Sequence, residues 1–170
     1  MLITAKTRWI HALSCGLVIG ALDILFACLF WASRGVPSVR IFQSVAAGWY
    51  GKLAFTGGVK TASIGLVSHF AIAMAMALLY FSWNRRLCSR VIPWWLSGAV
   101  YGAILFFVMQ LVVVPLSRAG APDLSDDAWV LSNLGMHIFI GMICAKWSAW
   151  IESKLDLRRP LLTRVAGLHS

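Results

Sequence analysis

Five polar side chains interrupt the long apolar stretches of this sequence: Asp23, His69, Gln110, Asn133 and His137. A carboxylate beside two imidazoles can hold or transfer a proton, and the same donors suit a metal ion or a haem. An unpaired polar group inside lipid is costly, so such residues usually have a partner or a function. These five residues are therefore the candidate site, and the elements that position them come next.

The composition places those elements in a membrane. Of the 170 residues, 60% are hydrophobic and 12% are charged, and the mean hydropathy is +0.80. A soluble domain is about half apolar and about a quarter charged. These values exclude an ordinary soluble globule, a disordered chain and a fibrous repeat. The lipid bilayer is the expected partner of the apolar surface.

Four apolar blocks are long enough to cross a bilayer, which needs about 20 residues of helix. They run from Ile10 to Trp31, from Ala62 to Trp83, from Trp94 to Leu116, and from Trp129 to about Trp150. Tryptophans mark most of their ends, as is typical at the headgroup level. The sequence predicts an all-α membrane protein: a single transmembrane domain over residues 1–170, with four transmembrane helices in a compact antiparallel bundle.

The basic residues predict the orientation of these helices. Ten of them fall on the side of the N-terminus and five on the other side, which also carries Asp123, Asp126 and Asp127. The larger group gathers in clusters between or after the apolar blocks: Lys6 and Arg8; Arg85, Arg86 and Arg90; Lys146, Lys154, Arg158, Arg159 and Arg164. This distribution predicts that both termini are cytoplasmic. The net charge of +9 therefore reflects topology, and no nucleic-acid partner is expected.

The first connection, between the first two blocks, contains a further predicted helix over about residues 38–55. Its apolar residues recur at helical spacing and form a stripe: Val39, Phe42, Val45, Ala46, Trp49 and Leu53. Arg40, Gln43 and Lys52 lie off this stripe. Such a segment is typical of an amphipathic interfacial helix. We expect it to cover the outer ends of the long helices as a lid. A role in gating or substrate binding is the alternative.

The candidate site residues share one depth and one face. Asp23, His69, Gln110 and His137 each lie five to eight residues from the outer end of their block. At 1.5 Å per residue this is roughly 8–12 Å below the outer surface. Small residues share the helical stripe of each polar residue, which favours close packing of these faces. The sequence thus predicts a polar cluster in the outer half of the bundle, with Asp23 paired to a histidine.

No local motif assigns an enzymatic activity or a cofactor to this cluster. The chain has no Ser-His-Asp order, phosphate loop or HExxH, and Cys15, Cys28, Cys88 and Cys144 form no CxxC pair. We expect no catalytic residue, no metal site and no cofactor. A metal site made by Asp23, His69 and His137, or a haem between the two histidines, remains a less favoured alternative.

Several short segments resemble a family of small four-helix bacterial inner-membrane proteins of uncharacterised activity, loosely similar to the YagU-like proteins. They are Arg40 to Gly48, Ala54 to Gly58, Thr61 to Leu66, His69-Phe70, Tyr101-Gly102, Val113 to Ser117, and His137. The resemblance implies a location in the bacterial inner membrane. It also points to Arg40, Gln43, Gly57 and Gly58 as features of the outer loop.

The favoured function is a structural or accessory component of the membrane, which associates with itself or with another membrane protein. The alternative is a small proton-linked or small-solute transporter or channel that works as an oligomer. The first interpretation needs the polar cluster to be a closed hydrogen-bond network. The second needs space for a solute beside it.

Overall fold

The structure, a computed structural model, describes residues 2–87 and 92–166, with side chains over residues 5–83 and 92–155, and all regular secondary structure in this part is helical. Its long helices are α1 (Leu2–Ala32), α3 (Gly58–Leu87), α4 (Trp94–Val108) and α6 (Asp127–Ala166). The shorter elements are α2 (Ser38–Tyr50), the 3-10 helix η1 (Gly51–Thr56), the π-helical turn η2 (Met109–Val113) and α5 (Val114–Leu116). The predicted all-α class is confirmed over these residues.

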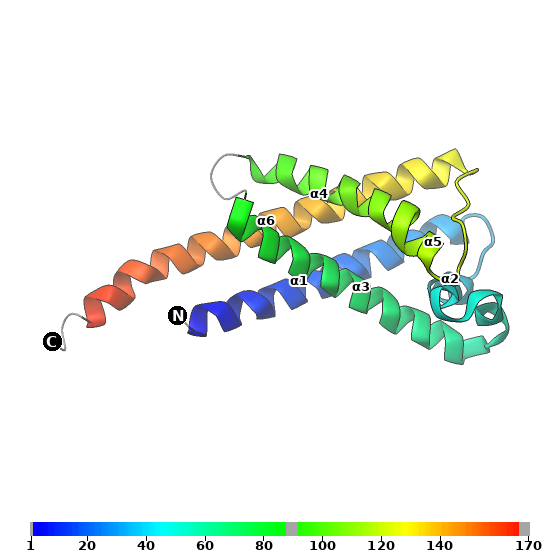
Figure 1. Ribbon diagram of the computed structural model, residues 1–170, viewed down its shortest axis with the longest axis horizontal. Helices are drawn as coiled ribbons and strands as arrows, with labels where there is room; N and C mark the ends of the chain where they lie inside the picture. The colour runs from blue at the N-terminus through cyan, green and yellow to red at the C-terminus, as the bar shows by residue number, and fades with distance from the viewer. Residues whose placement is uncertain (1, 88–91, 167–170) are drawn as a thin grey trace.

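Four helical stretches are long and apolar enough to cross a membrane: Ala5–Ala32, Gly58–Trp83, Trp94–Leu116 and Asp127–Leu155. Each contains one predicted block, so the expectation of four helices long and apolar enough to cross a membrane is confirmed. Helix α6 continues well beyond Trp150 and projects from the rest of the molecule (Figure 1). Cys88 and Arg90 of the predicted basic loop lie outside the described residues, as do the side chains of Arg85, Arg86, Arg158, Arg159 and Arg164.

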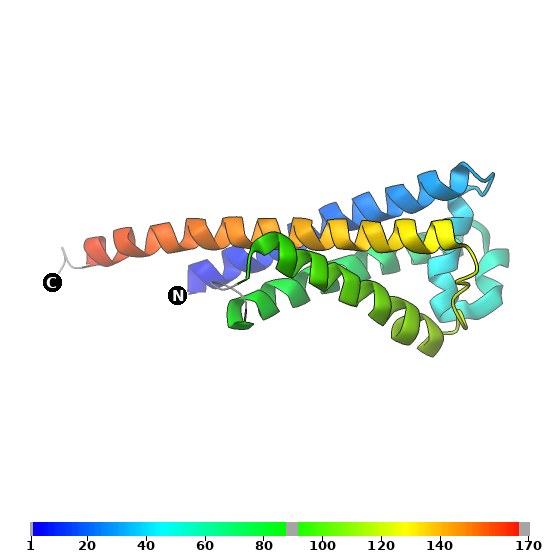
Figure 2. The same ribbon diagram turned by 90° about the horizontal axis from the view of Figure 1, so that it is seen from above.

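The long helices pack in pairs. Helix α1 contacts α3 and α6, α4 lies along α6, and α2 with η1 sits against α3. Figures 1 and 2 show α2 and η1 gathered at one end of the molecule, opposite the start of α1. We call this end the α2 end. It is also where the chain passes from α5 into α6, so every polar residue of the candidate site lies on a helix that reaches it.

Glycines set the distance between α4 and α6. A Cβ atom on Gly98 would lie 2.7 Å from the carbonyl oxygen of Gly141, and one on Gly102 would strike the His137 carbonyl. Real Cβ atoms do not approach backbone so closely, and therefore the two helices pack backbone to backbone. The expected small-residue faces are thus the faces in contact for this pair.

Helix α2 packs on α3 through a face that differs from the predicted apolar stripe. Its buried residues are Gln43, Ala46 and Ala47, whereas Trp49 and Leu53 are 63% and 73% exposed. Gln43 was expected to lie off the packed face, but its Nε2 donates to the Gly58 carbonyl at 3.1 Å. The hydrogen-bonded amide and the two small alanines let α2 approach α3 closely. The approach is so close that a Cβ on Gly65 of α3 would strike the Phe42 carbonyl.

The α2 segment also ends earlier than predicted. The α-helix stops at Tyr50 because Gly51 has a φ of +58°, a left-handed conformation that ends helices and favours glycine. The chain then continues to Thr56 as the 3-10 helix η1. The predicted range of about 38–55 is therefore helical but is divided into two elements, with a change of direction between them.

The opposite end of the molecule is held by Arg8 of α1. Its guanidinium donates to Glu152 Oε1 of α6 at 2.9 Å and to the Phe81 carbonyl of α3. One cation therefore joins three helices. This contact adds to the packing of the buried residues near it, which include Ala12, Phe81 and Ile151.

Replacing Gly102 by alanine tests the contact between α4 and α6. The added methyl would overlap backbone atoms of α6, so we expect the free energy of unfolding to fall by about 1–3 kcal/mol. Gly135 of α6 has open space around it and is the matched control. There Gly135→Ala should be neutral or stabilise by up to about 1 kcal/mol. Thermal unfolding in detergent micelles measures both, and equal stability of the two variants would contradict the packing.

Candidate functional site

The five polar residues predicted from the sequence line one cavity of about 220 Å³ near the α2 end. Asp23 comes from α1, His69 from α3, Gln110 from η2, and Asn133 and His137 from α6. Helix α2 contributes Ile41, Ser44 and Val45. The structure thus brings the whole predicted set together around a space and places the predicted amphipathic segment against that space.

His69 connects α3 to α1. Its Nε2 lies 2.9 Å from the carbonyl oxygen of Gly20, so this nitrogen carries the proton and donates it. The same Nε2 is 4.0 Å from Asp23 Oδ2. That distance is too long for a hydrogen bond, so Asp23 and His69 are neighbours without the direct hydrogen bond that was expected. The Asp23 carboxylate therefore retains capacity to accept hydrogen bonds from the cavity.

His137 also bonds to a backbone carbonyl. Its Nδ1 lies 3.0 Å from Asn133 O, one turn earlier in α6, and its ring meets the Phe106 ring edge to face with centroids 5.6 Å apart. When the ring is neutral, a proton on Nδ1 leaves the Nε2 lone pair as an acceptor. Both histidines thus take backbone partners rather than the Asn133 and Gln110 amides that a closed network would use.

The third span is not a continuous α-helix, which the sequence analysis did not anticipate. After Val108 the chain forms the π turn η2, in which the Val114 N–H donates to Met109 O, five residues earlier. Pro115 explains the turn, since proline has no N–H and its ring crowds the carbonyl four residues before it. Gln110 lies in this turn and lines the cavity. Such turns occur often at functional sites. Pro115 is the sequence feature from which this turn could have been predicted.

Aromatic side chains form the wall of the cavity nearest the α2 end. Trp31 of α1 and Trp129 of α6 line it, with ring centroids 5.3 Å apart, and Phe26 stacks on Trp129 at 6.0 Å. Outside this wall, Arg34 forms an ion pair with Asp126 and lies 4.4 Å from the centre of the Phe30 ring. These tryptophans were expected at the headgroup level, and their place in the cavity lining was not predicted.

The cavity lining offers hydrogen-bond acceptors but no basic side chain of lysine or arginine. It contains the carboxylate of Asp23. Within the described residues no group of three or more His, Cys, Asp or Glu side chains is arranged to hold a metal ion. The Asp23, His69 and His137 set therefore does not converge on one point as metal ligands would. What the arrangement offers is hydrogen-bond acceptors around a space large enough for a small molecule.

The outer-loop residues that the family resemblance singled out lie beside the cavity, whereas His69 lies in its lining. Gln43 bonds to Gly58 O as described above, and Arg40 lies over the Phe55 ring at 5.5 Å. A Cβ on Gly57 would strike Thr61, and Gly58 has a φ of +59° where α3 begins. These four residues hold α2 and η1 onto α3, which fixes the cover of the cavity.

A scan against protein-family models, a search of curated proteins and a search of solved structures each found no match to this chain. The resemblance to the YagU-like proteins therefore stays a prediction, and the site is interpreted from its own geometry.

Removing the His69 donor tests the contact between α1 and α3. We expect His69→Ala to lower the free energy of unfolding by about 1 kcal/mol, because one partly buried hydrogen bond between helices is lost. His69→Gln keeps an N–H donor and should lose less. Thermal unfolding in detergent distinguishes the two, and a wild-type stability for His69→Ala would show that the bond contributes nothing.

Proposed function

We propose that this chain is an integral protein of the bacterial inner membrane, with both termini in the cytoplasm and the α2 end facing outward. Four apolar helices and the distribution of basic residues support this arrangement. In it the four spans form an antiparallel bundle, and α2 is an interfacial helix at the outer face. The lipid bilayer is the partner of the exposed apolar surface.

We further propose that the bundle binds a small cationic solute in its outer half, as the binding site of a small-solute or proton-linked transporter that works as an oligomer. The observation that carries this proposal is the cavity of about 220 Å³ around Asp23. A purely structural network would close on itself. Here the carboxylate faces a space, and its histidine contact is 4.0 Å long.

The acceptors and the aromatic wall favour a cation over an anion. Asp23 presents carboxyl oxygens, and His137 presents Nε2 as an acceptor when its ring is neutral and Nδ1 donates to Asn133 O. Trp31 and Trp129 also line the cavity, and aromatic rings attract cations. A small amine or guanidine-like solute has N–H donors and charge that match all of these groups.

The second candidate is a structural or accessory membrane component, and one observation favours it. The bond from His69 Nε2 to Gly20 O joins α1 to α3 at the level of the cavity. In this interpretation the polar residues position helices for contact with another copy or another membrane protein. The two candidates differ in whether Asp23 binds anything from outside the chain.

A topology measurement tests the proposed orientation. A reporter that is active only in the cytoplasm, fused after Ser170, should be active, and the same reporter inserted at Gly120 should be inactive. The reason is the excess of basic residues on the side of the termini. An inactive C-terminal fusion with an active insertion would reverse the orientation.

Thermal stabilisation by cations tests the solute proposal. Methylammonium or guanidinium at low millimolar concentration should raise the Tm of the purified protein above that in sodium chloride of equal ionic strength. Binding linkage is worth about 2–4 °C for each kcal/mol in a chain of this size. Asp23→Asn should abolish the shift while the protein still folds, since the amide keeps the shape of the side chain.

Asp123→Asn is the matched control, because it makes the same charge change outside the spans. The Ser125 hydroxyl and N–H donate to the Asp123 carboxylate at 2.6 and 3.0 Å, which lowers its pKa, so it is ionised at neutral pH. This variant should keep the full shift. If neither cation raises the Tm, or if Asp23→Asn responds like the wild type, the solute proposal is wrong and the structural candidate stands.

A further inference from the structure

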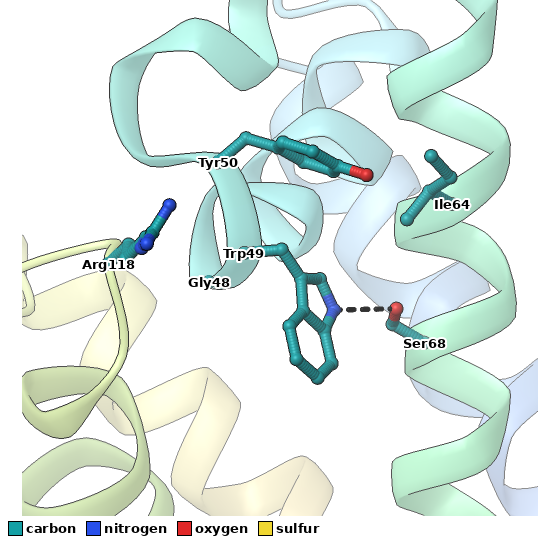
Figure 3. Close-up of a pocket in the computed structure, with 6 residues that line it drawn as sticks. All are labelled: Gly48, Trp49, Tyr50, Ile64, Ser68 and Arg118. Carbon is teal, nitrogen blue, oxygen red and sulfur yellow. Dashed lines mark hydrogen bonds between the residues drawn. The ribbon is translucent and has the colours of Figure 1, made fainter.

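A second pocket lies at the α2 end, separate from the polar cavity. It has a volume of about 520 Å³ and is lined by Gly48, Trp49, Tyr50, Ile64, Ser68 and Arg118. We call it the Trp49 groove. Figure 3 shows it between the end of α2, helix α3 and the chain that follows α5. None of its lining residues belongs to the candidate site.

The groove is built by specific contacts. The Arg118 N–H donates to the Gly48 carbonyl at 3.0 Å, which fixes the chain after α5 against the last turn of α2. On the other side, Trp49 Nε1 donates to Ser68 Oγ at 3.0 Å, the dashed line of Figure 3. A Cβ on Gly51 would lie 3.3 Å from the Arg118 carbonyl, so glycine permits this approach. The two walls are therefore held at fixed positions around an open space.

Arg118 supplies the charge of the groove. Its side chain is exposed and has no hydrogen bond or ion pair within the described residues, unlike Arg34, which is paired with Asp126, and Arg40, which bonds to the Phe55 carbonyl. A guanidinium presents a planar set of donors that suits the oxygens of a phosphodiester. Tyr50 lies on the same side of the groove and extends toward Ile64 (Figure 3).

The groove runs from the headgroup level into the level of the acyl chains. Arg118 follows the end of the third span at Leu116 by two residues. Ser68 lies ten residues into the span that begins at Gly58, or about 15 Å along the helix. Near these residues in the sequence, Val67 and Leu116 are 69% and 83% exposed, which is apolar surface that a membrane would cover. The site is cationic at one end and apolar at the other.

We infer that the Trp49 groove binds one glycerophospholipid of the leaflet at the α2 end, with its phosphodiester on Arg118 and an acyl chain along Trp49 and Ile64. The ligand is an amphiphile because the charge lies at the headgroup level and the aromatic and aliphatic surface lies below it. A soluble phosphate would use only the upper end. The bound lipid fills the space between α3 and the chain after α5, which no side chain of the lining occupies.

Native mass spectrometry of the full chain, released from detergent after mixing with phosphatidylglycerol, tests the inference. The wild type should retain one phospholipid in a form that survives release. Arg118→Gln should lower the population of this one-lipid form at least five-fold, and Arg118→Lys should keep most of it because the charge remains. Lys60→Gln is the matched control, since Lys60 is an exposed cation of the same end that does not line the groove, and it should leave the population unchanged.

Three results would overturn the inference. One is equal lipid retention by Arg118→Gln and the wild type. Another is an equal loss in Lys60→Gln, which would indicate bulk charge rather than a site. The third is displacement of the lipid by millimolar glycerophosphoglycerol, which lacks acyl chains and would indicate a soluble phosphodiester site. Circular dichroism of Arg118→Gln checks its fold, which should be unchanged because Arg118 is anchored through its backbone N–H.

Discussion

A polar side chain inside a bilayer must find a partner or water, because lipid offers it neither. In the proposed membrane arrangement this constraint acts on the five residues that line one cavity: Asp23, His69, Gln110, Asn133 and His137. The histidines meet it with backbone carbonyls of Gly20 and Asn133. The carboxylate of Asp23 is left facing the cavity with a 4.0 Å contact to His69, so the remaining demand for partners falls on whatever occupies that space.

The rest of the fold at the α2 end follows from enclosing this cavity. Glycines let α4 approach α6 and let α2 approach α3, while Pro115 forces the π turn that carries Gln110. Helix α2 covers the cavity with Ile41, Ser44 and Val45. Trp31 and Trp129 form the cavity wall nearest the α2 end. At the other end Arg8 joins α1, α3 and α6 through Glu152 and the Phe81 carbonyl.

Much of this arrangement follows from the sequence, because hydropathy and spacing act locally along a helix. Each of the four predicted apolar blocks lies within a long apolar helix, and the residues predicted to share one depth line one cavity. Two features did not follow. The packed face of α2 centres on Gln43 and two alanines, since backbone approach to Gly65 outweighs burial of the large apolar side chains. The break in the third apolar helix depends on Pro115. That this break places Gln110 in a π turn is apparent only from the three-dimensional structure.

The proposed solute site requires that the five polar residues surround a space that water can reach, which a closed network would not leave. Cysteine accessibility tests it most directly, with the four native cysteines replaced by alanine. Gln110→Cys lines the cavity, and Leu111→Cys on the next residue is 63% exposed on the apolar surface. A small cationic methanethiosulfonate applied to the protein in lipid should modify the cysteine at position 110 rapidly and the one at position 111 slowly. Protection of both, or faster reaction at position 111, would contradict the account.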